Sequence, residues 1–76
     1  MEKPLYQKVR DMREDRDEKQ ETLARMLKIT TQQYSLYETG KREFKQHHII
    51  ALCRHFGVSA DYLLGLPDDL RYPKKK

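Results

Sequence analysis

The fold of this chain is decided by residues 20–42, which read QETLARMLKITTQQYSLYETGKR. Near the start of the stretch, Leu23, Ala24 and Leu27 have the spacing of the apolar face of a short helix. Asp17 stands three residues before Gln20, and this pair resembles a capping box. We therefore expect a helix here that starts before Gln20.

A second helix is expected over residues 31–38 of the same stretch. Thr30 is a good N-cap and Gln33 follows three residues later, so each side chain can satisfy a free backbone N–H of the other. Tyr34 and Tyr37 then face inward, and Gly40 suits the left-handed position that ends a helix. A helix this short is unstable alone in water and must be held by packing.

Working outward, three further short helices are predicted, one before this stretch and two after it. Pro4 suits the first turn of the earliest helix, whereas Gly57 and Gly65 suit the ends of the last two, and Ser59 caps the fifth with Asp61 in its first turn. Each helix has its own apolar positions: Leu5, Val9 and Met12 in the first, Ile49, Leu52, Cys53 and Phe56 in the fourth, and Leu63 in the fifth. The prediction is an all-α, compact domain of five helices, two of which are joined by about three residues as in a helix-turn-helix.

Length and charge set the organisation of the chain. Its 76 residues are enough for one domain, which we place at residues 1–65, followed by a basic tail at residues 66–76. The net charge is +4, but residues 1–27 contribute nothing to it and residues 28–56 contribute +3. The excess of basic residues therefore surrounds the expected helix over residues 31–38 and recurs in the terminal lysines of the tail. This distribution of charge favours an anionic partner such as nucleic acid.

Other classes of protein are excluded by composition. The longest apolar run, residues 49–53, is far short of the ~20 residues that span a bilayer. A single cysteine, Cys53, forms no internal disulfide, and no signal peptide is recognisable, so we expect a reduced, cytoplasmic protein. Cys53 is expected in the core, and no set of ligands for a metal, no cofactor motif and no catalytic arrangement is visible. We therefore expect no enzyme activity.

Residues 5–65 resemble the Cro/C1-type (XRE) helix-turn-helix family of phage repressors and small bacterial regulators. The resemblance rests on residues 20–24 (QETLA), 27–30 (LKIT), 37–42 (YETGKR) and 56–65 (FGVSADYLLG). It implies a lambda-repressor-like fold and a regulator that binds double-stranded DNA. Two departures stand out: Asp17 and Glu18 make the corner before the second helix acidic, and Lys28 stands where the family commonly has Gly. A left-handed backbone at Lys28 would cost about 1 kcal/mol.

The helix over residues 31–38 is expected to enter the DNA major groove. Its predicted outward side chains are the candidate base readers, Thr31, Gln32, Ser35 and Leu36. Gln pairs with adenine through two hydrogen bonds, Thr contacts bases or phosphate, and an exposed Leu covers a thymine methyl group. For Gln32 the alternative is a solvated amide, and for Leu36 it is a contact with protein.

Around this helix, a further set of residues is expected to contact DNA phosphates: Gln20, Thr30, Lys41, Arg42 and Lys45. The family implies the role of Gln20, whose alternative is pairing with Asp17 alone. The lysines and the arginine are suited to phosphate by charge. His47 and His48, at the expected start of the fourth helix, could add neutral donors to phosphate. They are a poor metal pair, because adjacent helical side chains point about 100° apart.

The family also implies an ion pair between Arg13 and Glu38, which would fix the helix over residues 31–38 against the scaffold. The alternative is two unrelated surface charges. This pair is predicted to be structural, with no direct contact with DNA.

The expected function is that of a sequence-specific regulator, a repressor, that binds a palindromic operator as a homodimer, because one helix reads only a few base pairs. Leu66, Leu70 and Tyr72 in the tail are candidate dimer contacts. The alternative is a protein-interaction module of the same fold, such as an antitoxin or a modulator of a larger regulator.

Overall fold

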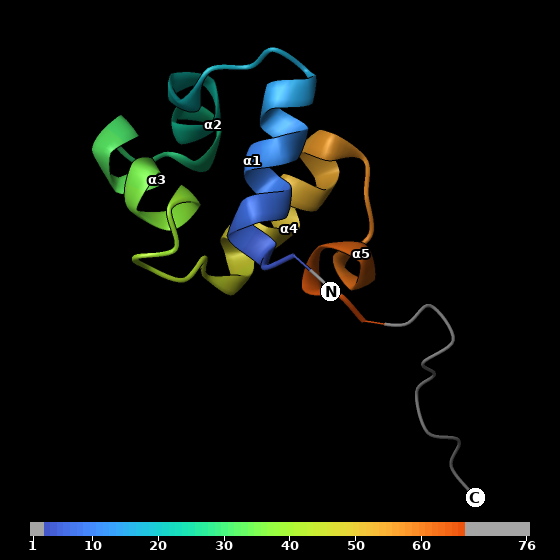
Figure 1. Cartoon of the computed structure of the whole chain (residues 1–76). Helices are drawn as coiled ribbons and strands as arrows, with labels where there is room; N and C mark the ends of the chain where they lie inside the picture. The colour runs from blue at the N-terminus through green and yellow to red at the C-terminus, as the bar shows by residue number, and fades with distance from the viewer. Residues whose placement is uncertain (1–2, 67–76) are drawn as a thin grey trace, which may run out of the picture.

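The computed structural model describes residues 3–66, and in this range the chain forms five helices and no strand. They are α1 (Leu5–Asp15), α2 (Gln20–Leu27), α3 (Thr31–Glu38), α4 (Gln46–Phe56) and α5 (Ala60–Leu64). Helix α1 packs against α3 and α5, α2 packs against α3 and α4, and α4 packs against α5 (Figure 1). The all-α, five-helix prediction is confirmed. The tail predicted to follow the domain lies outside the described residues apart from Leu66.

The apolar positions predicted from helical spacing meet in one core. One fully buried residue from each of the five helices forms its centre: Val9, Leu23, Tyr34, Leu52 and Leu63. Cys53 is half-buried against this core, as predicted, and burial raises the pKa of its thiol. Because each helix is short, the packing of these side chains is the main source of helix stability.

Local capping rules account for most helix boundaries. Thr30 Oγ1 accepts a hydrogen bond from the Gln33 N–H, while Gln33 Oε1 accepts one from the Thr30 N–H, both at 3.0 Å. This is the predicted capping box. Ser59 caps α5 through a hydrogen bond from the Tyr62 N–H, and Gly57 closes α4 in the left-handed conformation. These three boundaries are confirmed.

The start of α2 differs from the prediction. The helix begins at Gln20, and its N-cap, Lys19, makes no capping hydrogen bond through its side chain. Asp17 has a φ of 55° and lies in the turn between α1 and α2, so it cannot cap this helix. The prediction of an Asp17–Gln20 capping box with an earlier start is wrong, because the left-handed residue turns the chain before α2.

Candidate nucleic-acid interface

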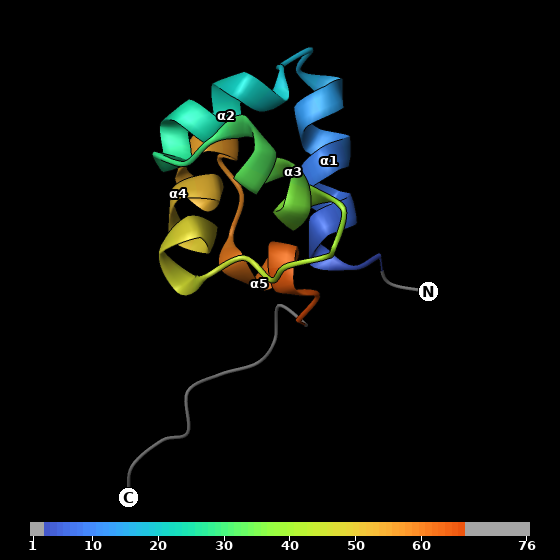
Figure 2. The same ribbon diagram turned by 90° about the vertical axis from the view of Figure 1, so that its left-hand side faces the viewer.

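Helices α2 and α3 are joined by a short turn and form the helix-turn-helix unit (Figure 2). Lys28 ends α2 with φ 62° and ψ 42°, so it occupies the left-handed conformation without being glycine. This position, where the family commonly has Gly, therefore has the left-handed backbone that costs a non-glycine residue about 1 kcal/mol. The turn delivers Thr30 as the cap of α3, which fixes where that helix starts.

The candidate base readers on α3 differ in their exposure. Thr31 and Gln32, in the first turn of the helix, are exposed, whereas Ser35 and Leu36 are half-buried. The backbone carbonyls of these last two residues also accept hydrogen bonds, Ser35 O from Thr39 Oγ1 and Leu36 O from the Lys41 and Arg42 N–H groups. The N-terminal end of α3 is therefore the part whose side chains are free to contact a partner.

Basic side chains lie at both ends of α3. Lys28 is exposed in the turn before the helix, and Lys41, Arg42 and Lys45 are exposed in the loop after it. The N–H groups of Lys41 and Arg42 donate to Leu36 O at 2.9 and 3.1 Å, so the backbone of this loop is tied to the last turn of α3. A duplex lying along α3 would thus meet positive charge on both sides of the helix.

The α3–α4 loop is fixed by aromatic packing that the sequence did not reveal. Phe44 is buried and stacks on Tyr37, with ring centroids 5.2 Å apart. His48 is only 2% exposed, its ring packs edge-on against Tyr37, and its Nδ1 accepts a hydrogen bond from the Lys45 N–H. Burial, together with the neighbouring His47 and Lys45, lowers the pKa of His48.

The suggestion that both histidines donate to phosphate is therefore wrong for His48, which is a core residue. His47 is exposed beside it. Among the described residues, no group of three or more His, Cys, Asp or Glu side chains is arranged to hold a metal ion.

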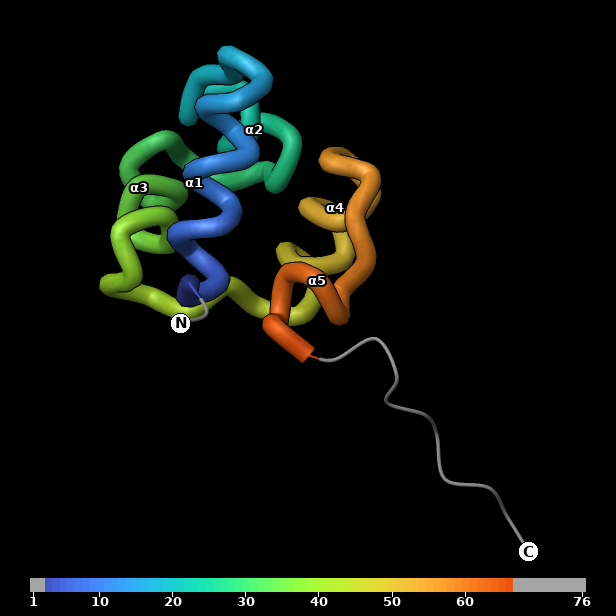
Figure 3. Tube along the Cα trace, turned by 45° about the vertical axis from the view of Figure 1, so that its right-hand side comes forward, coloured from blue at the N-terminus to red at the C-terminus, as the bar shows by residue number. Residues whose placement is uncertain are grey.

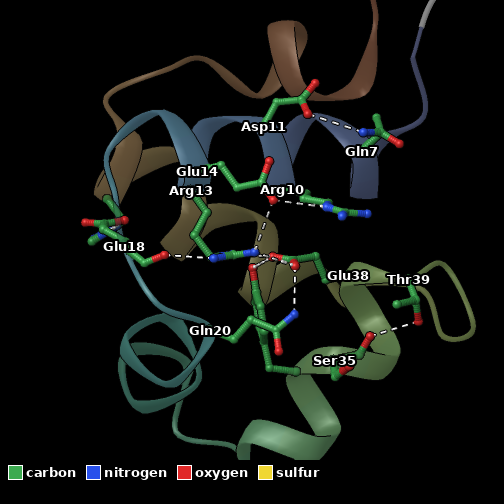
Figure 4. Close-up of polar contacts among 12 residues, drawn as sticks. Gln7, Arg10, Asp11, Arg13, Glu14, Glu18, Gln20, Ser35, Glu38 and Thr39 are labelled. Carbon is green, nitrogen blue, oxygen red and sulfur yellow. Dashed lines mark hydrogen bonds and ion pairs between the residues drawn. The ribbon is translucent and has the colours of Figure 1, made fainter.

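Glu38, at the end of α3, is the centre of a buried polar cluster (Figure 4). Arg13 Nε donates to Glu38 Oε2 at 2.8 Å, and Arg13 Nη2 donates to Oε1 at 3.1 Å. Gln20 Nε2 donates to Oε1 at 2.8 Å, and the Tyr34 hydroxyl donates to Oε2 at 2.6 Å. One carboxylate thus joins α1, α2 and α3.

The charges of this cluster are stabilised by their mutual contacts. Burial alone would raise the pKa of Glu38, but the hydrogen bonds from Arg13, Tyr34 and Gln20 outweigh it and hold that pKa below its ordinary value. The hydrogen bond with Glu38 raises the pKa of Arg13. Burial and the bond to Glu38 raise the pKa of Tyr34 well above the usual range, so its hydroxyl remains a donor.

Gln20, which was predicted to contact a phosphate, forms a hydrogen bond within the protein. The residue is half-buried at the first position of α2, and its amide nitrogen is committed to Glu38. This bond uses one of the two N–H donors of the side-chain amide, so the other can donate to a phosphate. Gln20 can therefore hold Glu38 and contact a phosphate at the same time, through this second donor or through its backbone N–H.

The acidic corner before α2 also braces the scaffold. Arg13 Nη1 donates to Glu18 O at 2.8 Å, and His55 Nε2, near the end of α4, lies 2.9 and 3.0 Å from the two carboxylate oxygens of Glu18. Arg16 Nη1 adds a hydrogen bond to His55 O. Glu18, a departure from the family pattern, therefore links the corner to α4 and to the arginine that holds Glu38. Only the pairing of complementary charges could have suggested this contact from the sequence.

Helix α3 is short, has exposed polar side chains at its N-terminal end, and is held to the scaffold by Arg13 and Glu38, with basic residues at both of its ends. These features define the class of DNA-binding helix-turn-helix domains. A family model described as helix-turn-helix matches residues 9–63. The match covers most of the chain, and the chain belongs to this Cro/C1-type helix-turn-helix family. No curated protein and no solved structure matches the chain significantly. No helix in the described range is both long and apolar enough to pass through a membrane.

Proposed function

We propose that this protein is a sequence-specific transcriptional regulator, a repressor, that inserts α3 into the major groove of double-stranded DNA. The observation that carries the proposal is the contrast along α3. Thr31 and Gln32 are exposed at its N-terminal end, whereas Glu38 at its other end is buried and fixed by four hydrogen bonds. A rigidly held helix with a free polar end is what major-groove readout requires.

In the proposed complex, Gln32 reads a base edge and Thr31 contacts a base or a phosphate. Ser35 and Leu36, which are half-buried, contribute smaller contacts, with Leu36 against a thymine methyl group. The phosphate contacts come from Gln20, Thr30, Lys41, Arg42 and Lys45, and they set the position of the helix without reading sequence.

One helix contacts only a few base pairs, so we propose that the protein acts as a homodimer in the cytoplasm. Its palindromic operator would have half-sites ~34–36 Å apart. The proposed domain is residues 1–65, with residues 66–76 as a basic tail. Repression would follow from occupancy of the operator.

Two substitutions distinguish a residue that reads base sequence from a residue that contacts phosphates. Gln32→Ala should lose roughly 1–3 kcal/mol of discrimination at one or two base pairs, because the amide that pairs with a base edge is gone. Lys41→Ala should weaken binding to all DNA sequences alike and reduce the slope of log affinity against log salt concentration by about one. The measurement is fluorescence anisotropy across a panel of duplexes and salt concentrations.

The two variants control for each other, since both change an exposed side chain next to the same helix. An unchanged sequence preference in Gln32→Ala would remove that residue from the readers. An unchanged salt slope in Lys41→Ala would remove that residue from the phosphate contacts. A protein that bound no duplex in a salt-dependent manner would be better explained as a protein-interaction module.

A further inference from the structure

An apolar groove lies at the end of the domain where α1 begins and α5 ends. Its volume is about 420 Å³, and it is lined mainly by Pro4, Leu5, Tyr6, Phe44, Ile49 and Leu64. We call it the α1–α5 groove. Two charged residues of the α3–α4 loop, Arg42 and Glu43, also line it. The groove is therefore adjacent to the loop that carries the proposed phosphate contacts.

The described chain ends next to this groove. Leu64 is one of its walls, Gly65 turns the backbone in the left-handed conformation, and the Leu66 N–H donates to Asp61 O at 2.9 Å. Figure 3 shows α5 at the same end of the domain as the start of α1. The ten residues after Leu66 could extend about 33–36 Å. That reach is ample for a segment that starts two residues beyond the groove wall.

The sequence of the following segment matches the groove in polarity. Leu70 and Tyr72 alternate with Arg71, so in an extended conformation the two apolar side chains point to one side and the guanidinium points to the other. Pro67 and Pro73 flank this triplet and disfavour a helix there.

We propose that residues 70–72 dock in the α1–α5 groove of their own chain, with Leu70 and Tyr72 against its apolar walls, and hold Lys74, Lys75 and Lys76 beside the α3–α4 loop. Tethering favours this occupant, because a segment attached to the groove wall has an effective concentration of the order of millimolar. The consequence for DNA rests on the proposed function: the three lysines extend the phosphate-contacting surface beyond Arg42.

A single tryptophan tests the docking. The chain has no tryptophan, so Tyr72→Trp introduces a sole reporter. We expect its emission at shorter wavelength than that of a solvated tryptophan, with protection from acrylamide, and with no dependence on protein concentration. Adding Leu64→Asp should move the emission to that of a solvated tryptophan. The matched control is Ile50→Asp, because Ile50 is 45% exposed and Leu64 is 48% exposed, but Ile50 is not part of the groove lining.

Three results would overturn the docking: solvated emission in Tyr72→Trp itself, an equal response to both aspartate substitutions, or a blue shift that grows with protein concentration. The last would show that a second copy of the chain fills the groove. Circular dichroism of each variant checks that the helices are intact.

The DNA consequence has its own measurement. Replacing Lys74, Lys75 and Lys76 together by glutamine should reduce the salt slope of binding to a random-sequence duplex by about three. An unchanged slope would overturn the contribution of the lysines to binding. If no duplex bound at all, the proposed function would fail, whereas the fluorescence result on the protein alone would still decide the docking.

Discussion

Replacing Glu38 by alanine should cost about 3–5 kcal/mol of the free energy of unfolding. The Glu38 side chain is 3% exposed and that of Arg13 is 13% exposed, so the substitution leaves a largely buried guanidinium without its carboxylate. Removing one partner of a buried ion pair has this magnitude because the remaining charge keeps its desolvation penalty. A chain of this length has a total stability of only about 4–11 kcal/mol. Glu38→Ala should therefore lose about a quarter of it or more.

The assay is urea denaturation followed by far-ultraviolet circular dichroism, with Arg13→Ala and the double variant completing a cycle. The double variant should cost about 2 kcal/mol less than the sum of the two single variants, since neither charge is then left alone. Glu21→Ala serves as the control, because its pair with Arg25 is exposed and should contribute no more than about 0.5 kcal/mol. If Glu38→Ala cost no more than this control, the carboxylate would not hold α3 to the scaffold.

The remaining predictions concern backbone conformation and pH. Gly40→Ala should destabilise the protein by about 2–4 kcal/mol in urea denaturation, because a Cβ would lie 2.7 Å from two ring atoms of Tyr6 at a residue with φ of 82°. Gly57→Ala, which has a similar φ but no atom within 4 Å of the Cβ, should cost only about 1–2 kcal/mol, and equal effects would contradict the steric explanation. Lys28→Gly should raise the free energy of unfolding by about 0.5 kcal/mol in the same assay. Glycine removes the left-handed strain of about 1–2 kcal/mol, and this gain exceeds the cost of the added chain entropy, about 0.5–1 kcal/mol. A less stable variant would refute this explanation. Glu38 has a pKa below its ordinary value of 4.5, so its contribution to stability is present above that value and lost as pH falls through the lower folded pKa. Denaturation across the acid range should show this loss in the parent protein and a smaller loss in Glu38→Gln, whereas identical acid profiles would contradict it.

The parts of the fold that depend on nearby residues were predictable from the sequence. The Thr30–Gln33 capping box, the glycine ending α4 and the serine cap of α5 were each predicted correctly. Each of these features involves residues a few positions apart, so local geometry decides them. The buried tyrosines of α3 were likewise predicted from helical spacing.

Contacts between distant residues were not predictable from the residues themselves. The side chain of Lys8 is one example: it is buried, with Nζ donating to Tyr62 O at 2.7 Å and lying over the Tyr62 ring. This contact depends on how α5 packs on α1, which local spacing does not define. The same is true of Gln20, whose partner Glu38 is 18 residues away.

The candidate site shows the same division. The residue range of α3 was predicted, but the unequal exposure along it follows from tertiary packing. Leu36 was expected to face outward, yet it is half-buried with its carbonyl holding the α3–α4 loop. The pairing of Arg13 with Glu38 came from the family resemblance, because nothing in the local sequence brings together residues 25 positions apart.

The central claim is that α3 reads DNA sequence, and selection of duplexes from a random pool tests it most directly. We expect the selected sequences to converge on one two-fold symmetric site, with half-sites about one helical turn apart. The preference at one or two base pairs should relax in Gln32→Ala. Selection that enriched no sequence, with no salt-dependent binding to any duplex, would contradict the account.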